Sequence, residues 1–150
     1  MTLAVDKIKK KVSLNLADGS QLAGHFFLSP YTEMGVGQET LIQALTAGGR
    51  FIPFESTKGE YNFINPKQIV WVANIPEETS EEESLPVPLQ RRRVGVFLRD
   101  GKIFRGELIM AMPQEKSRLS DWLNEFKDYL VLREETREIL INVDYVVRVL

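Results

Sequence analysis

Cysteine is absent from the 150-residue sequence, and histidine occurs once, at His25. The lack of cysteine excludes disulfides, thiolate chemistry and cysteine-based metal sites, and it favours a reducing, cytoplasmic location. No apolar run approaches the ~20 residues that a membrane-spanning helix needs. The charged N-terminal stretch has no apolar segment of the kind found in secretory signals. The sequence therefore predicts a cytoplasmic protein with no membrane partner.

The formal net charge of −2 comes from one short stretch. Residues 74–90, NIPEETSEEESLPVPLQ, hold five glutamates and three prolines and little that a core would bury. Such a composition predicts an extended linker, because prolines stiffen the chain and like charges repel. The parts on either side are close to neutral. Net charge alone therefore gives no sign of strong nucleic-acid binding.

The two parts on either side of the linker repeat one pattern. Val12–Leu28 and Val94–Met110 each hold an alternating apolar run, an Asp-Gly pair and a second apolar run with an internal glycine. Two such runs joined by Asp-Gly predict a β-hairpin, since glycine tolerates the positive φ of a tight turn. Near the end of each part, Ile64–Asn65 matches Ile141–Asn142. The matched order of these features predicts an internal duplication.

Each copy is expected to contain five strands and one short helix, placed between the second and third strands. The helices are indicated by apolar positions at helical spacing from Leu41 and from Leu119, the second capped by Ser117 or Ser120. The predicted fold is mainly β, with two tandem five-stranded small barrels. The predicted organisation is a first barrel over residues 1–74, an acidic Pro/Glu-rich linker over 75–90 and a second barrel over 91–150. Whether the barrels pack on each other or swing on the linker is left open.

The strand plan resembles that of SH3-like and Sm-like small β-barrels. Val94–Gly106, Val-x-Val-x-Leu-x-Asp-Gly-x-x-x-x-Gly, is similar to the first part of the Sm motif, and Ile139–Val149 resembles its last two strands. The resemblance implies a small-barrel fold. Sm-like proteins that hold RNA carry an asparagine after the motif glycine and an Arg-Gly between the last strands. This chain has neither, so that family's nucleotide pocket has no equivalent position here.

No residue pattern predicts catalysis, a metal site or a cofactor site. His25 lacks the convergent partners that a general base or a metal ligand needs, which favours an ordinary surface or interface histidine. Gly35 and Gly37 lie before a predicted helix but lack the glycine spacing of a phosphate loop. A flexible loop explains them better. We therefore expect a protein that is not an enzyme and that carries no cofactor.

Basic runs precede the first strand of both copies. A nucleic-acid or anion contact would use the phosphate attraction of these side chains. The alternative is a charged strand that blunts an exposed sheet edge. The candidate nucleic-acid contacts are Lys9, Lys10, Lys11, Arg91, Arg92, Arg93 and Arg105.

Four apolar side chains are predicted to point away from the barrel cores. A partner for them is expected if they form a contiguous patch, and half-sized barrels usually bury surface against something. The simplest partner is the other copy, and strand-edge pairing between copies or chains is the next simplest. The alternative is that the helix or strand curvature already covers them. The candidate interface residues are Phe27, Trp71, Phe97 and Ile109.

Two functions of different class follow. The first is a non-catalytic binding or assembly module that uses strand edges and outward aromatic rings, with a protein partner or self-association. The alternative is an Sm-like protein that binds RNA or single-stranded nucleic acid through the basic runs, with aromatic rings such as Phe97 stacking on bases.

Overall fold

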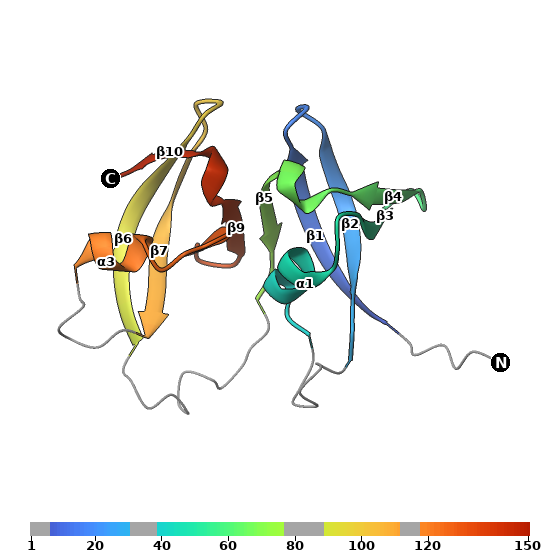
Figure 1. The fold of residues 1–150 in the computed structure, drawn as a ribbon, viewed down its shortest axis with the longest axis horizontal. Coiled ribbons are helices and arrows are strands. Elements are labelled where there is room, and N and C mark those ends of the chain that lie inside the picture. The colour runs from blue at the N-terminus through green and yellow to red at the C-terminus, as the bar shows by residue number, and fades with distance from the viewer. Residues whose placement is uncertain (1–6, 31–38, 77–88, 112–117) are drawn as a thin grey trace. The chain divides into compact units, whose positions relative to one another are not determined.

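The protein is described by a computed structural model that covers residues 7–30, 39–76, 89–111 and 118–150 (Figure 1). The described residues form a mainly β structure with ten strands and two short α-helices, and the strand pairings within each unit are antiparallel. The chain divides into two compact units, Met1–Ile69 and Val70–Leu150. Most of the predicted linker, and the loop with Gly35 and Gly37, lie outside the described residues.

The first unit contains a four-stranded arrangement in the order β1-β2-β3-β4. Alternation along β1 buries Val12 and Leu14 and exposes Lys11 and Ser13, so one face of the sheet forms the core. Phe26 and Phe54 meet edge to face in this core, with ring centroids 5.0 Å apart. The elements are β1 (Ile8–Leu16), β2 (Gln21–Leu28), α1 (Leu41–Ala47), β3 (Ile52–Ser56), β4 (Tyr61–Ile64) and the 3-10 helix η1 (Pro66–Gln68).

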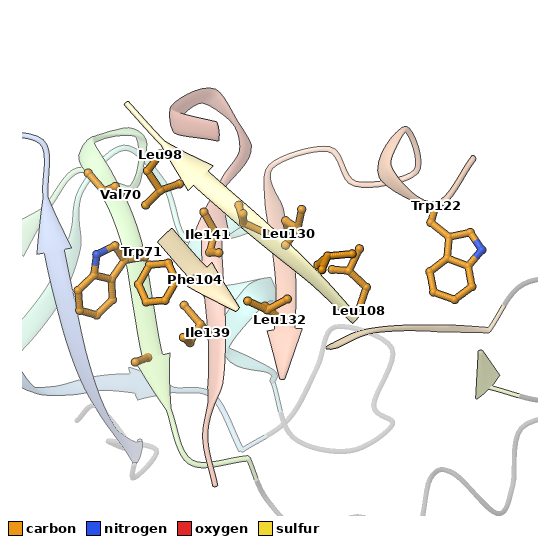
Figure 2. Close-up of a cluster of buried hydrophobic side chains, with 13 residues drawn as sticks. Val70, Trp71, Leu98, Phe104, Leu108, Trp122, Leu130, Leu132, Ile139 and Ile141 are labelled. Atoms are coloured by element: carbon orange, nitrogen blue, oxygen red, sulfur yellow. The ribbon is translucent and has the colours of Figure 1, made fainter. Parts of the chain in front are cut away.

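The second unit contains six strands in the order β10-β6-β7-β8-β9-β5. Its core is a cluster of buried apolar side chains that includes Trp71, Phe104, Leu132 and Ile141 (Figure 2). The elements are β5 (Ile69–Asn74), β6 (Leu89–Leu98), β7 (Ile103–Ala111), α3 (Leu119–Leu123), β8 (Tyr129–Arg133), β9 (Glu138–Asn142), the 3-10 helix η3 (Val143–Tyr145) and β10 (Val146–Val149).

Both predicted Asp-Gly hairpins are confirmed, as β1–β2 and β6–β7. Gly19 and Gly101 have φ values of 90° and 89°, while no non-glycine residue among those that the structure describes has a positive φ. In each turn the aspartate side chain accepts a hydrogen bond from the backbone N–H two residues later, Asp18 from Ser20 and Asp100 from Lys102. The turns are therefore three-residue loops with one left-handed glycine, since a two-residue type I′ turn would need positive φ at the aspartate too.

A second pair of glycines permits close approach of the next strand. A Cβ on Gly24 would lie 2.1 Å from the carbonyl oxygen of Glu55, and a Cβ on Gly106 would lie 2.6 Å from that of Arg133. Only glycine fits where backbones come this close. The internal glycines of the repeat therefore serve the same contact in both units.

The two helices differ in how they begin. In α1 the hydroxyl of Thr40 accepts from the N–H of Gln43, whose side chain accepts from the N–H of Thr40, a complete capping box. In α3 the cap position is Arg118, which makes no side-chain cap bond. Ser120 lies inside α3 and does not cap it, and Ser117 lies outside the described residues.

The strand β5 belongs mostly to the second unit. It was predicted as the fifth strand of the first barrel, and it pairs with β9 from Trp71 opposite Ile141 to Asn74 opposite Glu138. The compact units divide after Ile69, and the predicted end of the first repeat at residue 74 stays a prediction.

Candidate functional site

The four candidate interface residues lie in unlike surroundings. Phe27 is half-buried on the outer face of β2 and is parallel to the ring of Tyr61, with centroids 6.1 Å and planes 2° apart. Phe97 is half-buried beneath the guanidinium of Arg148, 3.8 Å from the ring centroid. Ile109 is half-buried on β7. These three side chains retain accessible surface outside the cores.

Trp71, by contrast, does not point to solvent. It is 9% exposed and meets Phe104 edge to face, with ring centroids 5.4 Å apart, inside the core of the second unit (Figure 2). The prediction placed Trp71 away from the core of the first repeat, with the other copy as its simplest partner, and the ring packs on Phe104 of that copy. The pairing of β5 with β9 gives the physical reason, because it places the indole over the second core.

The basic runs are divided by strand alternation. Lys9 and Lys11 are exposed, while Lys10 between them is half-buried. Arg92 lies with its guanidinium 5.6 Å from the centre of the buried Trp122 ring, on the core side of β6. All three arginines are exposed, and strand alternation places Arg91 and Arg93 on the face opposite to Arg92. The three basic side chains of each run are therefore divided between the two faces of their strand.

Arg105 occupies space that a glycine leaves open on β6. Gly95 lies opposite Arg105 in the β6–β7 register, and a Cβ there would lie 3.4 Å from Nη1 of Arg105. No ion pair joins Arg93 or Arg105 to an acidic side chain in the described part of the second unit. Arg133, on the neighbouring β8, is paired with Glu138 at 3.1 Å.

His25 has a partner that sequence reasoning missed. Its Nε2 lies 3.0 Å from Oε1 of Glu55, and the two residues are opposite each other in the β2–β3 register. Nε2 of His25 makes no hydrogen bond, so the contact is one of proximity. Period-two counting on β3 could have placed Glu55 on this outer face, but the register that brings it to His25 could not be read from local sequence.

Two of the described titratable groups have a shifted pKa that bears on the structure around them. The hydroxyl and backbone N–H of Ser20 lower the pKa of the Asp18 carboxyl below its usual value. Burial, with a smaller effect from Asp128, raises the pKa of the Tyr129 phenol. Within residues 7–30, 39–76, 89–111 and 118–150, no three histidine, aspartate or glutamate side chains lie together as metal ligands.

Two strands pair on one side only among the strands that the structure describes. The strand β4 pairs with β3, and β10 pairs with β6. Their equivalents in the other copy, β9 and β5, pair with each other. The large exposed apolar side chains of the described chain include Tyr61 and Phe63 on β4, and Val147 and Leu150 on and after β10. Sequence reasoning named none of these four, although they mark the free edges.

No described helix combines the length and apolar character that crossing a membrane requires. No protein-family model matches this chain, and comparisons with curated proteins and with solved structures give no match either. The proposals that follow therefore stand on residue geometry.

Proposed function

We propose that the protein is a non-catalytic assembly module of two tandem small β-barrels, which associates with further copies of itself through strand edges. The barrel plan is supported by the strand order of the second unit, since β10-β6-β7-β8-β9 is the order five-one-two-three-four of a small barrel. The first copy supplies the matching series β1-β2-β3-β4.

One observation carries the assembly proposal: the pairing of β9 with β5. In terms of the repeat, the fourth strand of the second copy accepts the fifth strand of the first copy. Such strand addition satisfies backbone donors and acceptors along both edges. The same two kinds of edge remain on β4, a fourth strand, and on β10, a fifth strand. A second copy of the chain supplies the partner for each.

The repeat also specifies the register of this contact. The two copies are offset by 77 residues over their last two strands. Transferring the pairs Trp71–Ile141, Val72–Leu140 and Ala73–Ile139 gives the corresponding contact between two chains. In that register Arg148 lies opposite Ile64, Val149 opposite Phe63, and Leu150 opposite Asn62.

This contact joins unlike surfaces, so it is head-to-tail. A head-to-tail contact closes into a ring if its rotation closes and otherwise continues as a filament. The bulge in β10 between Val146 and Arg148 is the feature that opposes this proposal, because bulges also serve to protect edges. It does not extend to Val149 and Leu150, where the proposed register falls.

The test exploits the alternation of hydrogen bonding along β10. Leu150 exchanges two backbone hydrogen bonds of 2.8 Å with Gly95 on β6. Since bonding residues alternate in antiparallel strands, the N–H of Val149 points away from β6 and toward the free edge. Val149→Pro removes this donor and leaves the β6 bonds in place, while Val149→Ala shortens the side chain and keeps the donor.

Light scattering on a sizing column measures the mass of each protein over a range of concentrations. The wild-type protein and Val149→Ala are expected to form rings or filaments of several chains, and Val149→Pro is expected to dissociate to monomers with an unchanged circular dichroism spectrum. A wild-type protein that is monomeric at every concentration would refute self-assembly. An oligomer that Val149→Pro leaves intact would refute the edge and its register.

A further inference from the structure

The outer face of the first unit carries aromatic rings beside lysines. In the β1–β2 register Lys9 lies opposite Phe27 and Lys11 opposite His25. The ring of Phe27 is parallel to that of Tyr61, and the ring of His25 meets Phe27 edge to face with centroids 5.0 Å apart. We call this surface the lysine–aromatic face. It comprises Lys9, Lys11, His25, Phe27 and Tyr61.

The face is open and retains its positive charge. Tyr61 is 61% exposed, and both lysines are exposed. Glu55 lies between His25 and Tyr61 in the sheet register, with Oε1 3.0 Å from Nε2 of His25. No ion pair joins Lys9 or Lys11 to a carboxylate in the described part of the chain. The lysine charges are therefore available to a ligand.

The combination of aromatic rings and lysines indicates which class of ligand this face binds. Protein interfaces are depleted in lysine relative to the rest of the surface. Interfaces with nucleic acid are strongly positive, and single strands stack their bases on aromatic side chains beside a basic track. We infer that the lysine–aromatic face binds single-stranded nucleic acid, with a base stacked on Tyr61 and phosphates near Lys9 and Lys11. The site uses the outer face of the sheet, whereas the proposed assembly uses the backbone edge of β4, the strand that carries Tyr61.

The stacking part is tested by fluorescence anisotropy with a labelled oligouridylate and an oligothymidylate at low salt. Tyr61→Leu keeps an apolar side chain and removes the flat aromatic surface. Stacking of one base on one ring accounts for about five- to one-hundred-fold in affinity, so the variant is expected to bind more weakly by this factor. A Tyr61→Phe variant retains the ring and is expected to bind within about twofold of wild type.

The phosphate part is tested by the salt dependence of the same binding. Each phosphate contact on a single strand contributes about 0.7 to the slope of log affinity against log salt. The double variant Lys9→Gln/Lys11→Gln is expected to lower that slope by about 1.4. Lys58→Gln removes the same charge from the exposed β3–β4 turn of this unit and is expected to leave the slope unchanged.

Several outcomes would overturn the inference. One is that neither oligonucleotide binds at low salt. Another is that a double-stranded oligonucleotide binds as tightly as the single strands. A third is that polyglutamate competes as well as an unlabelled oligonucleotide, which would indicate a site for any polyanion. Loss of binding in Arg93→Gln or Phe97→Leu, with Tyr61→Leu unaffected, would place the site on the second unit. Repeating the titration with Val149→Pro separates the two proposals, because monomers that still bind retain the site without the assembly. A preference for uridine over thymidine oligonucleotides would show that RNA is the ligand.

Discussion

The last two strands of each copy are equivalent in sequence position and opposite in environment. Leu140 on β9 is 2% exposed, while Phe63, its equivalent on β4, is 69% exposed. Val70 on β5 is 6% exposed, and its equivalent Val147 on β10 is 63% exposed. Both buried members lie on the two strands that pair with each other. Burial at these positions is therefore decided by whether a neighbouring strand is present, and apolar character alone does not decide it.

The largest loss of stability is expected at the position where the equivalent strands β5 and β10 carry the most different residues. Trp71 on β5 and Arg148 on β10 occupy equivalent positions, and Trp71→Ala removes a buried ring from the second core. Such a truncation costs about 3–5 kcal/mol of unfolding free energy. Arg148→Ala loses a surface cation–π contact with Phe97, which contributes about 0.5–1 kcal/mol. Urea unfolding followed by circular dichroism measures both. Equal losses would show that Trp71 does not anchor β5 to the second core.

The next largest loss of stability is expected at the glycines whose missing side chain lets a neighbouring strand come close. A Cβ on Gly24 meets the carbonyl oxygen of Glu55 at 2.1 Å and the Cα of Ser56 at 2.8 Å, both of them backbone atoms. Gly24→Ala is expected to destabilise the first unit by about 3 kcal/mol, since overpacking typically costs 1–3 kcal/mol and backbone cannot yield cheaply. Gly95→Ala is the control, because the nearest atom to its Cβ is the end of the Arg105 side chain at 3.4 Å. It is expected to change stability by less than about 1 kcal/mol. A neutral Gly24→Ala would contradict the close approach.

The hairpins, the internal glycines and the positions of most strands were predictable, because their signals are local. Val12 and Leu14 alternate on one strand, and the Asp-Gly pairs fix the turns. The partner of β5 was not predictable, since pairing between distant strands depends on the whole sheet and not on a local period. On β4, Tyr61 and Phe63 alternate with the polar Asn62, so period-two counting predicts that the two aromatic side chains are buried, whereas both are exposed. Comparison with β9 does not correct this, because Ile139, Leu140 and Ile141 are all buried there.

The dependence of strand pairing on the whole sheet also explains which residues of the candidate site were missed. Sequence reasoning selected Phe27, Lys9 and Lys11, and the structure places all three on one outer face. It missed Tyr61, whose contact with Phe27 spans β3 and depends on a register between strands far apart in sequence. It also grouped Arg92 with Arg91 and Arg93, although alternation along β6 separates them. Period-two counting on the predicted strand would have corrected that grouping.

A third prediction concerns alkaline pH and separates the two units. The buried Tyr129 has a raised pKa, and its equivalent in the first copy is the exposed Phe51. Because the folded state keeps the phenol proton where the unfolded chain releases it, this stabilisation is fully present below the ordinary pKa of 10.0 and declines above it. The expected decline is about 1.4 kcal/mol per pH unit. Urea unfolding followed by tryptophan fluorescence reports the second unit, which contains Trp71 and Trp122. Tyr129→Phe should flatten this decline, and an equal decline in that variant would assign it to other groups.

The smallest effect is expected at the two helix starts. Thr40→Ala removes the hydroxyl that accepts from the N–H of Gln43, and loss of such a cap costs about 1 kcal/mol. Arg118→Asn supplies a capping side chain where α3 has none, at the expense of an exposed ion pair with Asp121. Surface pairs three residues apart contribute about 0.2–0.5 kcal/mol, so the exchange should stabilise α3 by about 0.5 kcal/mol. Amide hydrogen exchange of each helix measures both changes. Slower exchange in α3 of Arg118→Asn, with faster exchange in α1 of Thr40→Ala, would show that the duplicated helices differ in stability partly through their first residues. Unchanged exchange in both would mean that packing of Leu45 and Trp122 alone holds the helices in place.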